Sequence, residues 1–199
     1  MPKLLTDADR QQKRQSILDA AAAEIARYGY DRANINTIAE RAGIERGTIY
    51  LYFASKDEVL SALLDTIGAT IDETIGQCIA VDLPWRDRLQ RFAHAFVRLA
   101  EQHRDYFRVQ VSALHGVNRD VGEPMSRWLR TSVDRLAATL MAASAQGTIQ
   151  ALPAETLATY IVGTLESFVL LPDALHQNDD PQQRAETLAR LLWRGLAPD

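Results

Sequence analysis

Residues 34–56 read Asn-Ile-Asn-Thr-Ile-Ala-Glu-Arg-Ala-Gly-Ile-Glu-Arg-Gly-Thr-Ile-Tyr-Leu-Tyr-Phe-Ala-Ser-Lys, and their apolar members recur at helical intervals. The first apolar stripe consists of Ile35, Ile38, Ala39 and Ala42. This spacing predicts a two-turn helix with one buried face. Asn34 is a residue type that caps helix starts, and Gly43 readily takes the left-handed conformation that follows a helix end. The sequence therefore predicts a short helix that stops at a tight turn.

A second short helical pattern follows that turn. Its inward residues are Ile44, Ile49 and Phe53. Its outward residues are hydrogen-bond donors and aromatics with few acids among them: Arg46, Thr48, Tyr50 and Tyr52. Two short helices joined by a tight turn, with a donor-rich outer face on the second, are typical of a helix-turn-helix that reads the DNA major groove.

Helical patterns also flank this motif and fill the rest of the chain. A helix is expected over 10–28, ending at Gly29, and Ser55 with Glu58 forms a capping box that opens another. Prolines at helix-starting positions and the stops at Gln146-Gly147 and Leu171-Pro172 predict the others. Their starting prolines are Pro84, Pro124, Pro153 and Pro181, and their ranges are 84–103, 105–116, 124–146, 153–171 and 181–196. We expect an all-α fold of about nine helices.

Composition and charge indicate how such a chain is organised. With 199 residues and 47% hydrophobic content, it is long enough for a small domain and a larger one. The net charge is -4, but residues 1–56 carry nine basic against seven acidic side chains, and residues 57–199 carry 13 against 19. A slightly basic first segment on an acidic body suits a DNA-binding domain, 10–58, followed by a second domain, 59–199.

Other features of the sequence exclude several classes of protein. The single cysteine, Cys78, cannot form an internal disulfide, and the N-terminus is polar rather than a signal segment. No apolar run approaches the roughly 20 residues of a membrane span. The four histidines have neither mutual helical spacing nor nearby ligands that suggest a metal site. We therefore expect a cytoplasmic protein without membrane contact, metal or cofactor, and not an enzyme.

At residues 10–56 the chain resembles the tetracycline-repressor (TetR) family of bacterial transcription regulators. The resemblance rests on Ile-Ala-Glu-Arg-Ala-Gly-Ile at 38–44, Gly-Thr-Ile-Tyr at 47–50, Tyr-Phe at 52–53 and Ser-Lys at 55–56. It covers the first quarter of the chain by motif and the remainder only by length and helix count. It implies a homodimer whose recognition helices enter the major groove and whose C-terminal domain binds a small effector that changes the distance between them.

The resemblance also implies which residues contact the double-stranded operator. They are Asn36, Thr37, Arg46, Gly47, Thr48, Tyr50, Tyr52 and Lys56. Arg46 has the paired donors that suit guanine, and Asn36 has the donor and acceptor that suit adenine. Phosphates that flank the site could be contacted by Arg10, Lys13 and Arg14. The alternative is that these three side chains are solvated charges with no role in DNA binding.

Glu45 departs from the family pattern, which often has Ser or Thr at the start of the recognition helix. A carboxylate at this position favours the helix dipole but repels phosphate. It either accepts a hydrogen bond from a cytosine amino group or is a cap directed away from DNA. We include Glu45 among the candidate DNA contacts with both interpretations open.

The second half of the chain has no comparable motif. Phe92, Phe96, Phe107 and Trp128 lie on helix-period stripes, and they either fill the core or line the effector cavity that the family implies. His94, His103 and Glu166 are possible polar contacts to the effector. The apolar helices over 153–171 and 181–196 either complete the monomer core or form a dimer seam, which the resemblance favours.

Together these features predict a ligand-responsive DNA-binding regulator, namely a repressor released from a near-palindromic operator by a small apolar or aromatic effector. An activator of the same family is one alternative, since the direction of control depends on where the operator lies. A ligand-binding or enzymatic helical protein with a vestigial DNA-binding motif is the other.

Overall fold

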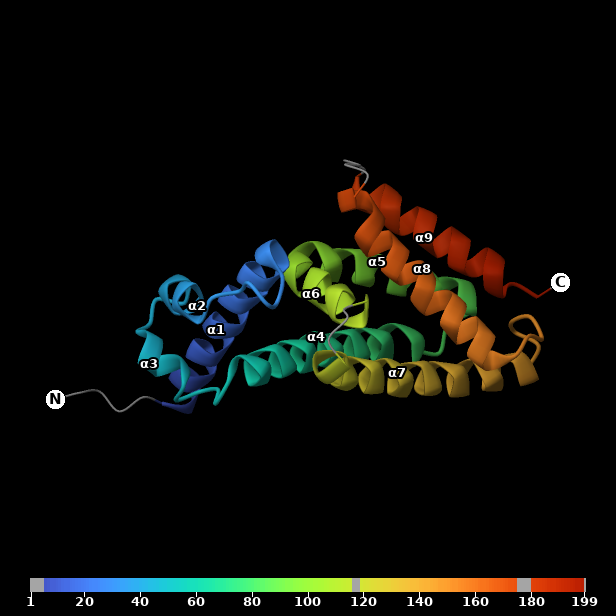
Figure 1. Cartoon of the computed structure of the whole chain (residues 1–199). Helices are drawn as coiled ribbons and strands as arrows, with labels where there is room; N and C mark the ends of the chain where they lie inside the picture. The colour runs from blue at the N-terminus through green and yellow to red at the C-terminus, as the bar shows by residue number, and fades with distance from the viewer. Residues whose placement is uncertain (1–5, 116–118, 175–179, 199) are drawn as a thin grey trace. The chain divides into compact units, whose positions relative to one another are not determined.

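The computed structural model of the chain describes residues 6–115, 119–174 and 180–198. These residues form nine α-helices and no strand (Figure 1). The helices are α1 Asp7–Tyr28, α2 Ile35–Arg41, α3 Arg46–Ile49, α4 Lys56–Ile79, α5 Trp85–Gln102, α6 Arg104–His115, α7 Arg119–Ala145, α8 Ala154–Ala174 and α9 Pro181–Leu196. The all-α prediction is confirmed. None of the helices in the described ranges is both long and apolar enough to cross a bilayer.

The chain divides into two compact units. The first contains Met1–Ile67 and Asp105–Met125, and the second contains Gly68–Arg104 and Ser126–Asp199. The first unit therefore includes α1, α2, α3, the start of α4 and nearly all of α6. The second includes α5, α8, α9 and the larger part of α7.

In the first unit, α1 packs on α2 and α2 packs on α3 (Figure 1). The helix α1 begins three residues before its expected start because Thr6 and Asp9 form a capping box. The Thr6 hydroxyl accepts from the Asp9 N–H at 3.2 Å, and the Asp9 carboxylate accepts from the Thr6 N–H at 2.9 Å. The backbone hydrogen bond from Thr6 lowers the pKa of Asp9. At the other end, Gly29 has a φ of 80°, so the predicted stop is confirmed.

The aromatic residue Tyr106 joins α6 to α1 within this unit. Its hydroxyl donates to the Asp19 carboxylate at 2.7 Å and accepts from the Gln15 amide at 2.9 Å. The same amide donates to Asp19 at 2.9 Å, so the three side chains form a closed network. Burial, followed by the neighbouring Asp19, raises the pKa of Tyr106. The hydroxyl therefore remains protonated and available as a donor.

Tyr106→Phe should destabilise the protein by about 1–2 kcal/mol, since it removes a partly buried hydrogen bond to a charged acceptor and keeps the ring. In urea unfolding, the midpoint concentration would fall, while the dependence of the unfolding free energy on urea concentration would stay the same. Tyr28→Phe is the control, because Tyr28 is 46% exposed and its hydroxyl makes no hydrogen bond among the described residues. Equal midpoints for Tyr106→Phe and the unmodified protein would contradict the role of the network.

In the second unit, α9 packs along α5 and beside α8 (Figure 1). The apolar faces of α5 and α9 form much of the core through the buried residues Leu89, Phe92, Ala93, Phe96, Leu188, Leu192 and Leu196. Arg184 and Glu101 join the two helices by an ion pair of 2.6 Å. The Tyr160 ring lies against Gly195, where a Cβ atom would collide with it. These contacts hold α5, α8 and α9 together.

The proline and glycine signals were only partly correct. Pro181 is the first residue of α9, and Gly147, with a φ of 67°, follows the end of α7 as predicted. The predicted start at Pro124 is wrong because α7 begins at Arg119, and the predicted stop at Pro172 is wrong because α8 continues to Ala174. Proline costs nothing in the first turn of a helix but also occurs further inside one at a cost, so its position alone does not fix a helix boundary.

Candidate DNA-binding site

The turn between α2 and α3 has the geometry expected from the sequence. The Asn34 side chain accepts from the Asn36 N–H at 2.9 Å and so caps α2. After the helix, Gly43 has a φ of 67°, its N–H donates to the Glu40 carbonyl, and the Ile44 N–H donates to the Ala39 carbonyl. The chain therefore makes a tight turn at Gly43 before α3 begins.

Two glycines of the motif have different backbone requirements, which a pair of variants should reveal. Gly43→Ala should cost about 1–2 kcal/mol because an alanine is strained at positive φ. Gly47→Ala should be neutral or stabilising by up to about 1 kcal/mol, since Gly47 lies inside α3 and a Cβ there meets nothing within 4 Å. Thermal unfolding of both variants would show this contrast. A Gly43→Ala protein as stable as Gly47→Ala would contradict it.

The helix α3 is only four residues long, and the chain continues as a tighter turn. The N–H groups of Leu51 and Tyr52 donate to carbonyls three residues earlier, whereas the Phe53 N–H donates to the Ile49 carbonyl four residues earlier. The predicted inward residues Ile49 and Phe53 are each 1% exposed. Ile44 is half-buried rather than buried, because it belongs to the turn.

The outer face of α3 is accessible. Arg46 and Gly47 are exposed, Tyr50 is 47% exposed, and Thr48 is half-buried. Within the described ranges, the Arg46 guanidinium has no ion pair or hydrogen bond. A positive charge and a phenol are thus free to meet a ligand beside Ile49, which anchors the helix to the core.

Glu45 occupies the N-cap position of α3, but its side chain makes no capping hydrogen bond. Its carboxylate is exposed and lies next to Arg46 in the chain. The described residues therefore show no capping hydrogen bond from Glu45, and its exposed carboxylate stays a candidate DNA contact. On the preceding helix, Asn36 is exposed and Thr37 is half-buried. Both lie in the first turn of α2.

Lys56, at the start of α4, has neighbours that the sequence did not indicate. Its ammonium lies 4.5 Å from the centre of the Tyr30 ring and donates to the Asp31 carbonyl at 3.3 Å. The Tyr30 hydroxyl in turn donates to Asp57, and burial followed by this hydrogen bond raises the pKa of Tyr30. Lys56 is therefore held by a cation–π contact in the first turn of a helix, where the dipole disfavours it. No periodic pattern points to Tyr30.

The capping box at the start of α4 is also modified. The Ser55 hydroxyl accepts from the Glu58 N–H at 3.1 Å, as predicted. The Glu58 carboxylate, however, accepts from the Ala54 N–H instead of the Ser55 N–H. Half-buried Tyr52 precedes this capping box.

Several arginines near the motif are engaged within the first unit. The Arg14 guanidinium lies 5.0 Å from the centre of the Phe53 ring, and Arg41 pairs with the buried Glu24 at 3.7 Å. Arg10 is exposed, and Lys13 is half-buried. Arg14 and Arg41 thus have structural partners, in contrast to Arg46.

Leu51 is the exposed residue that sequence reasoning missed. It is 82% exposed, although it lies between Tyr50 and Tyr52 in the motif. The tighter turn after Ile49 brings it outward, and helical periodicity alone does not predict this. An exposed aliphatic side chain beside the recognition helix has the chemistry to contact a thymine methyl group.

The candidate effector residues lie in different parts of the fold. Phe92 and Phe96 are buried on α5 with their ring centres 5.8 Å apart, and Phe107 is buried in the first unit. The Trp128 side chain lies outside the described part of the structure. His94, His103 and Glu166 are half-buried. No three potential metal ligands gather among the described side chains.

Comparison with known proteins agrees with this geometry. Residues 17–63 match the model of the bacterial regulatory proteins of the tetR family. An uncharacterised HTH-type transcriptional regulator of Bacillus subtilis, YvdT, is 26% identical over 190 residues, which are 92% of this chain and 95% of that protein. The chain belongs to the TetR family. It is a TetR-type transcriptional regulator, with α2 and α3 as its DNA-binding helix-turn-helix, and the family consists of regulators rather than enzymes.

Other TetR regulators and solved structures extend this comparison. The A-factor receptor protein of Streptomyces griseus is 41% identical over 58 residues, which are 29% of this chain but only 21% of that protein. FadR from Bacillus halodurans superposes with a TM-score of 0.81 at 24% identity, covering 90% of this chain and 94% of its own. FadR from Bacillus subtilis, solved with stearoyl-CoA, has a TM-score of 0.78 at 24% identity, covering 91% and 98%. The shared fold therefore includes both halves of the chain.

Proposed function

We propose that this TetR regulator is a homodimeric repressor that leaves a near-palindromic operator when a small apolar or aromatic effector binds. The observation that carries the proposal is the exposed outer face of α3, where Arg46 is unpaired and Tyr50 is 47% exposed while the adjacent Ile49 is buried. Unpaired donors on a short helix anchored to a core suit base and phosphate contacts.

In this proposal Arg46 reads a guanine edge and Asn36 an adenine, while Gly47 lets the backbone approach the DNA. Thr37, Thr48, Tyr50, Tyr52 and Lys56 complete the contacts, and Glu45 either accepts from a cytosine or faces away. Lys56 would meet a phosphate while retaining its cation–π contact with Tyr30, which holds the ammonium at 4.5 Å. The DNA-binding domain would comprise residues 10–58.

The domain over 59–199 would bind the effector and form the dimer. The B. subtilis FadR was solved with stearoyl-CoA, a ligand with a long apolar chain. The buried aromatic pair Phe92 and Phe96 favours an apolar or aromatic effector here as well. Phe107 and Trp128 are the further candidate walls. An activator role remains the alternative, since it depends on operator position.

A mobility shift with DNA from the gene's own upstream region tests the proposal directly. At near-physiological salt and with excess competitor DNA, non-specific electrostatic binding is suppressed. We expect a retained complex at about 10⁻⁸ M protein or below, the range typical of specific regulators. If neither this DNA nor sites selected from the whole genome bind, the vestigial-motif alternative is favoured.

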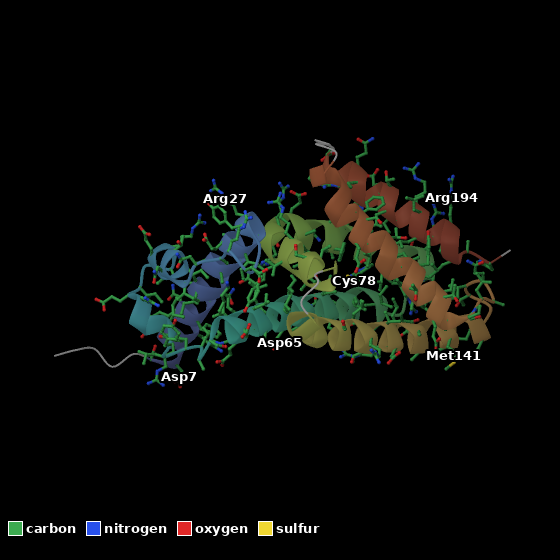
Figure 2. All side chains as sticks on the ribbon, viewed as in Figure 1. Asp7, Arg27, Asp65, Cys78, Met141 and Arg194 are labelled. Atoms are coloured by element: carbon green, nitrogen blue, oxygen red, sulfur yellow. The ribbon has the colours of Figure 1, made fainter. Side chains whose placement is uncertain are left out.

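The proposed dimer uses α8 and α9, where Tyr160 and Leu191 are 38% and 40% exposed. Leu191→Asp should convert a dimer of twice 22.2 kDa into a monomer in sedimentation velocity, because it buries an unpaired charge in the seam. Met141→Asp is the matched control, since Met141 is exposed on α7 (Figure 2). A Leu191→Asp protein that remains dimeric would exclude this seam.

A further inference from the structure

An open groove between α5 and α9 in the second unit has a volume of about 700 Å³. It is lined by Arg86 and Gln90 from α5 and by Glu186, Ala189, Arg190, Trp193 and Arg194 from α9. Arg194 is labelled on α9 in Figure 2. The groove thus collects three guanidinium groups and one indole ring in the half of the chain whose overall charge is negative.

The three arginines have no ion-pair or hydrogen-bond partner in the described part of the chain. Arg190 and Arg194 are one helical turn apart, a spacing at which like charges repel. Arg86 lies in the first turn of α5, where the helix dipole disfavours a cation. Only Arg194, in the last turn of α9, has a favourable position relative to its own helix. Local helix electrostatics therefore do not account for this cluster.

The carboxylate in the groove does not neutralise these charges. Glu186 precedes Arg190 by four residues, the favourable order for an acid and a base on a helix. Its carboxylate nevertheless accepts from the Gln182 amide at 3.4 Å and forms no ion pair with Arg190. The nearby Arg88 differs, because its guanidinium donates to the Leu83 and Ile79 carbonyls and so has a structural role.

Trp193 adds an aromatic surface to the cationic groove. Its side chain is half-buried, and both Trp193 and Arg86 also line a second hollow of about 800 Å³. The two hollows therefore adjoin each other at these residues. Volumes of this size match those of small-molecule sites, although this groove has more charged side chains than most, with Trp193 as the one aromatic wall among its described residues.

The geometry points to a binding site for a small aromatic molecule that carries an acidic group. Its ring would stack on Trp193, and its anion would accept charge-assisted hydrogen bonds from Arg190, Arg194 and Arg86. This site is separate from the apolar interior around Phe92 and Phe96, and it is independent of the DNA-binding role proposed above. It gives the regulator a place to bind an anionic compound on its surface.

Two fluorescent probes that differ by one acidic group test the site on the full-length protein without DNA. The first is 8-anilinonaphthalene-1-sulfonate, and the second is the uncharged N-phenyl-1-naphthylamine. Replacing Arg190 and Arg194 by alanine should weaken binding of the sulfonate about tenfold, the expected loss from two exposed charge-assisted contacts, and leave the uncharged probe unaffected. Arg91→Ala with Arg98→Ala is the control, because these exposed α5 residues do not line the groove.

Further variants keep the result interpretable. Arg86→Gln on α5 should weaken sulfonate binding without touching α9, and Trp193→Leu should weaken it by removing the ring. If the sulfonate binds the Arg190/Arg194 variant as well as it binds the Arg91/Arg98 control, or if it binds neither the control nor the unmodified protein, the proposal is overturned. If the Arg190/Arg194 variant changes the mass measured by sedimentation but not the binding of the sulfonate, that result assigns the arginines to a contact between copies of the chain and also overturns the proposal.

Discussion

Replacing Arg46 and Tyr50 together by alanine should lower operator affinity about a hundredfold or more while leaving the fold intact. An arginine that reads a base contributes about 1–3 kcal/mol, and a second contact from the adjacent face adds to it. Both side chains are exposed and Arg46 has no described partner, so their removal creates no cavity and breaks no buried pair. Titrated mobility shifts or fluorescence anisotropy with the operator would measure the change.

A neighbouring pair provides a close control for this variant. Arg27 and Tyr28 end α1 in the same unit, and Tyr28 is 46% exposed, almost as much as Tyr50. Arg27→Ala with Tyr28→Ala removes the same charge and the same aromatic area from a surface outside the motif. Operator affinity should then change by less than about threefold, because surface substitutions usually alter free energies by no more than about 0.5 kcal/mol. Similar losses in both double variants would contradict a specific role for α3.

The helix-turn-helix was predictable because its signals are local. Asn34 caps α2 through its own side chain, and Gly43 adopts the positive φ that its residue type favours. Ile38, Ile49 and Phe53 are buried where the helical period predicted. Each of these features depends on residues within one or two turns, so one sequence contains the information.

Contacts between distant segments were not predictable in this way. Tyr106 and Asp19 are separated by 87 residues and share a hydrogen bond, but neither has a spacing that signals the other. The contact of Lys56 with Tyr30 depends likewise on how the turn after α1 meets the start of α4. Such pairs follow from tertiary packing, which positions side chains after the helices have formed.

The prolines show why a local signal sometimes fails. Pro181 starts α9, whereas Pro124 and Pro172 lie within α7 and α8. Any proline has a restricted, helix-compatible φ and no N–H donor, whether it starts a helix or lies inside one. The three prolines differ in whether the helix continues on both sides of them. The residues of the whole segment decide this, and the proline alone does not.

Phe53→Ala should destabilise the first unit by about 3–5 kcal/mol, the usual cost of truncating a buried phenylalanine. Phe53 is 1% exposed, and the Arg14 guanidinium covers its ring at 5.0 Å, so the variant loses core packing and this contact together. Urea unfolding followed by circular dichroism would show an earlier transition for the first unit. Leu51→Ala is the control, because Leu51 is two residues away and 82% exposed, and its loss should cost less than about 0.5 kcal/mol.

Comparing Phe53→Ala with the Arg46/Tyr50 double variant separates folding from recognition in the same motif. Phe53→Ala should lose operator binding because α3 is no longer held against the core, and a lower temperature should restore part of the binding as the unit refolds. The Arg46 and Tyr50 variant should lose binding at every temperature while its unfolding midpoint stays unchanged. If Phe53→Ala unfolds within about 1 kcal/mol of the unmodified protein, its burial does not anchor the recognition helix. If replacing Arg46 and Tyr50 lowers the unfolding midpoint, the outer face of α3 contributes to the fold and is not a DNA-reading surface.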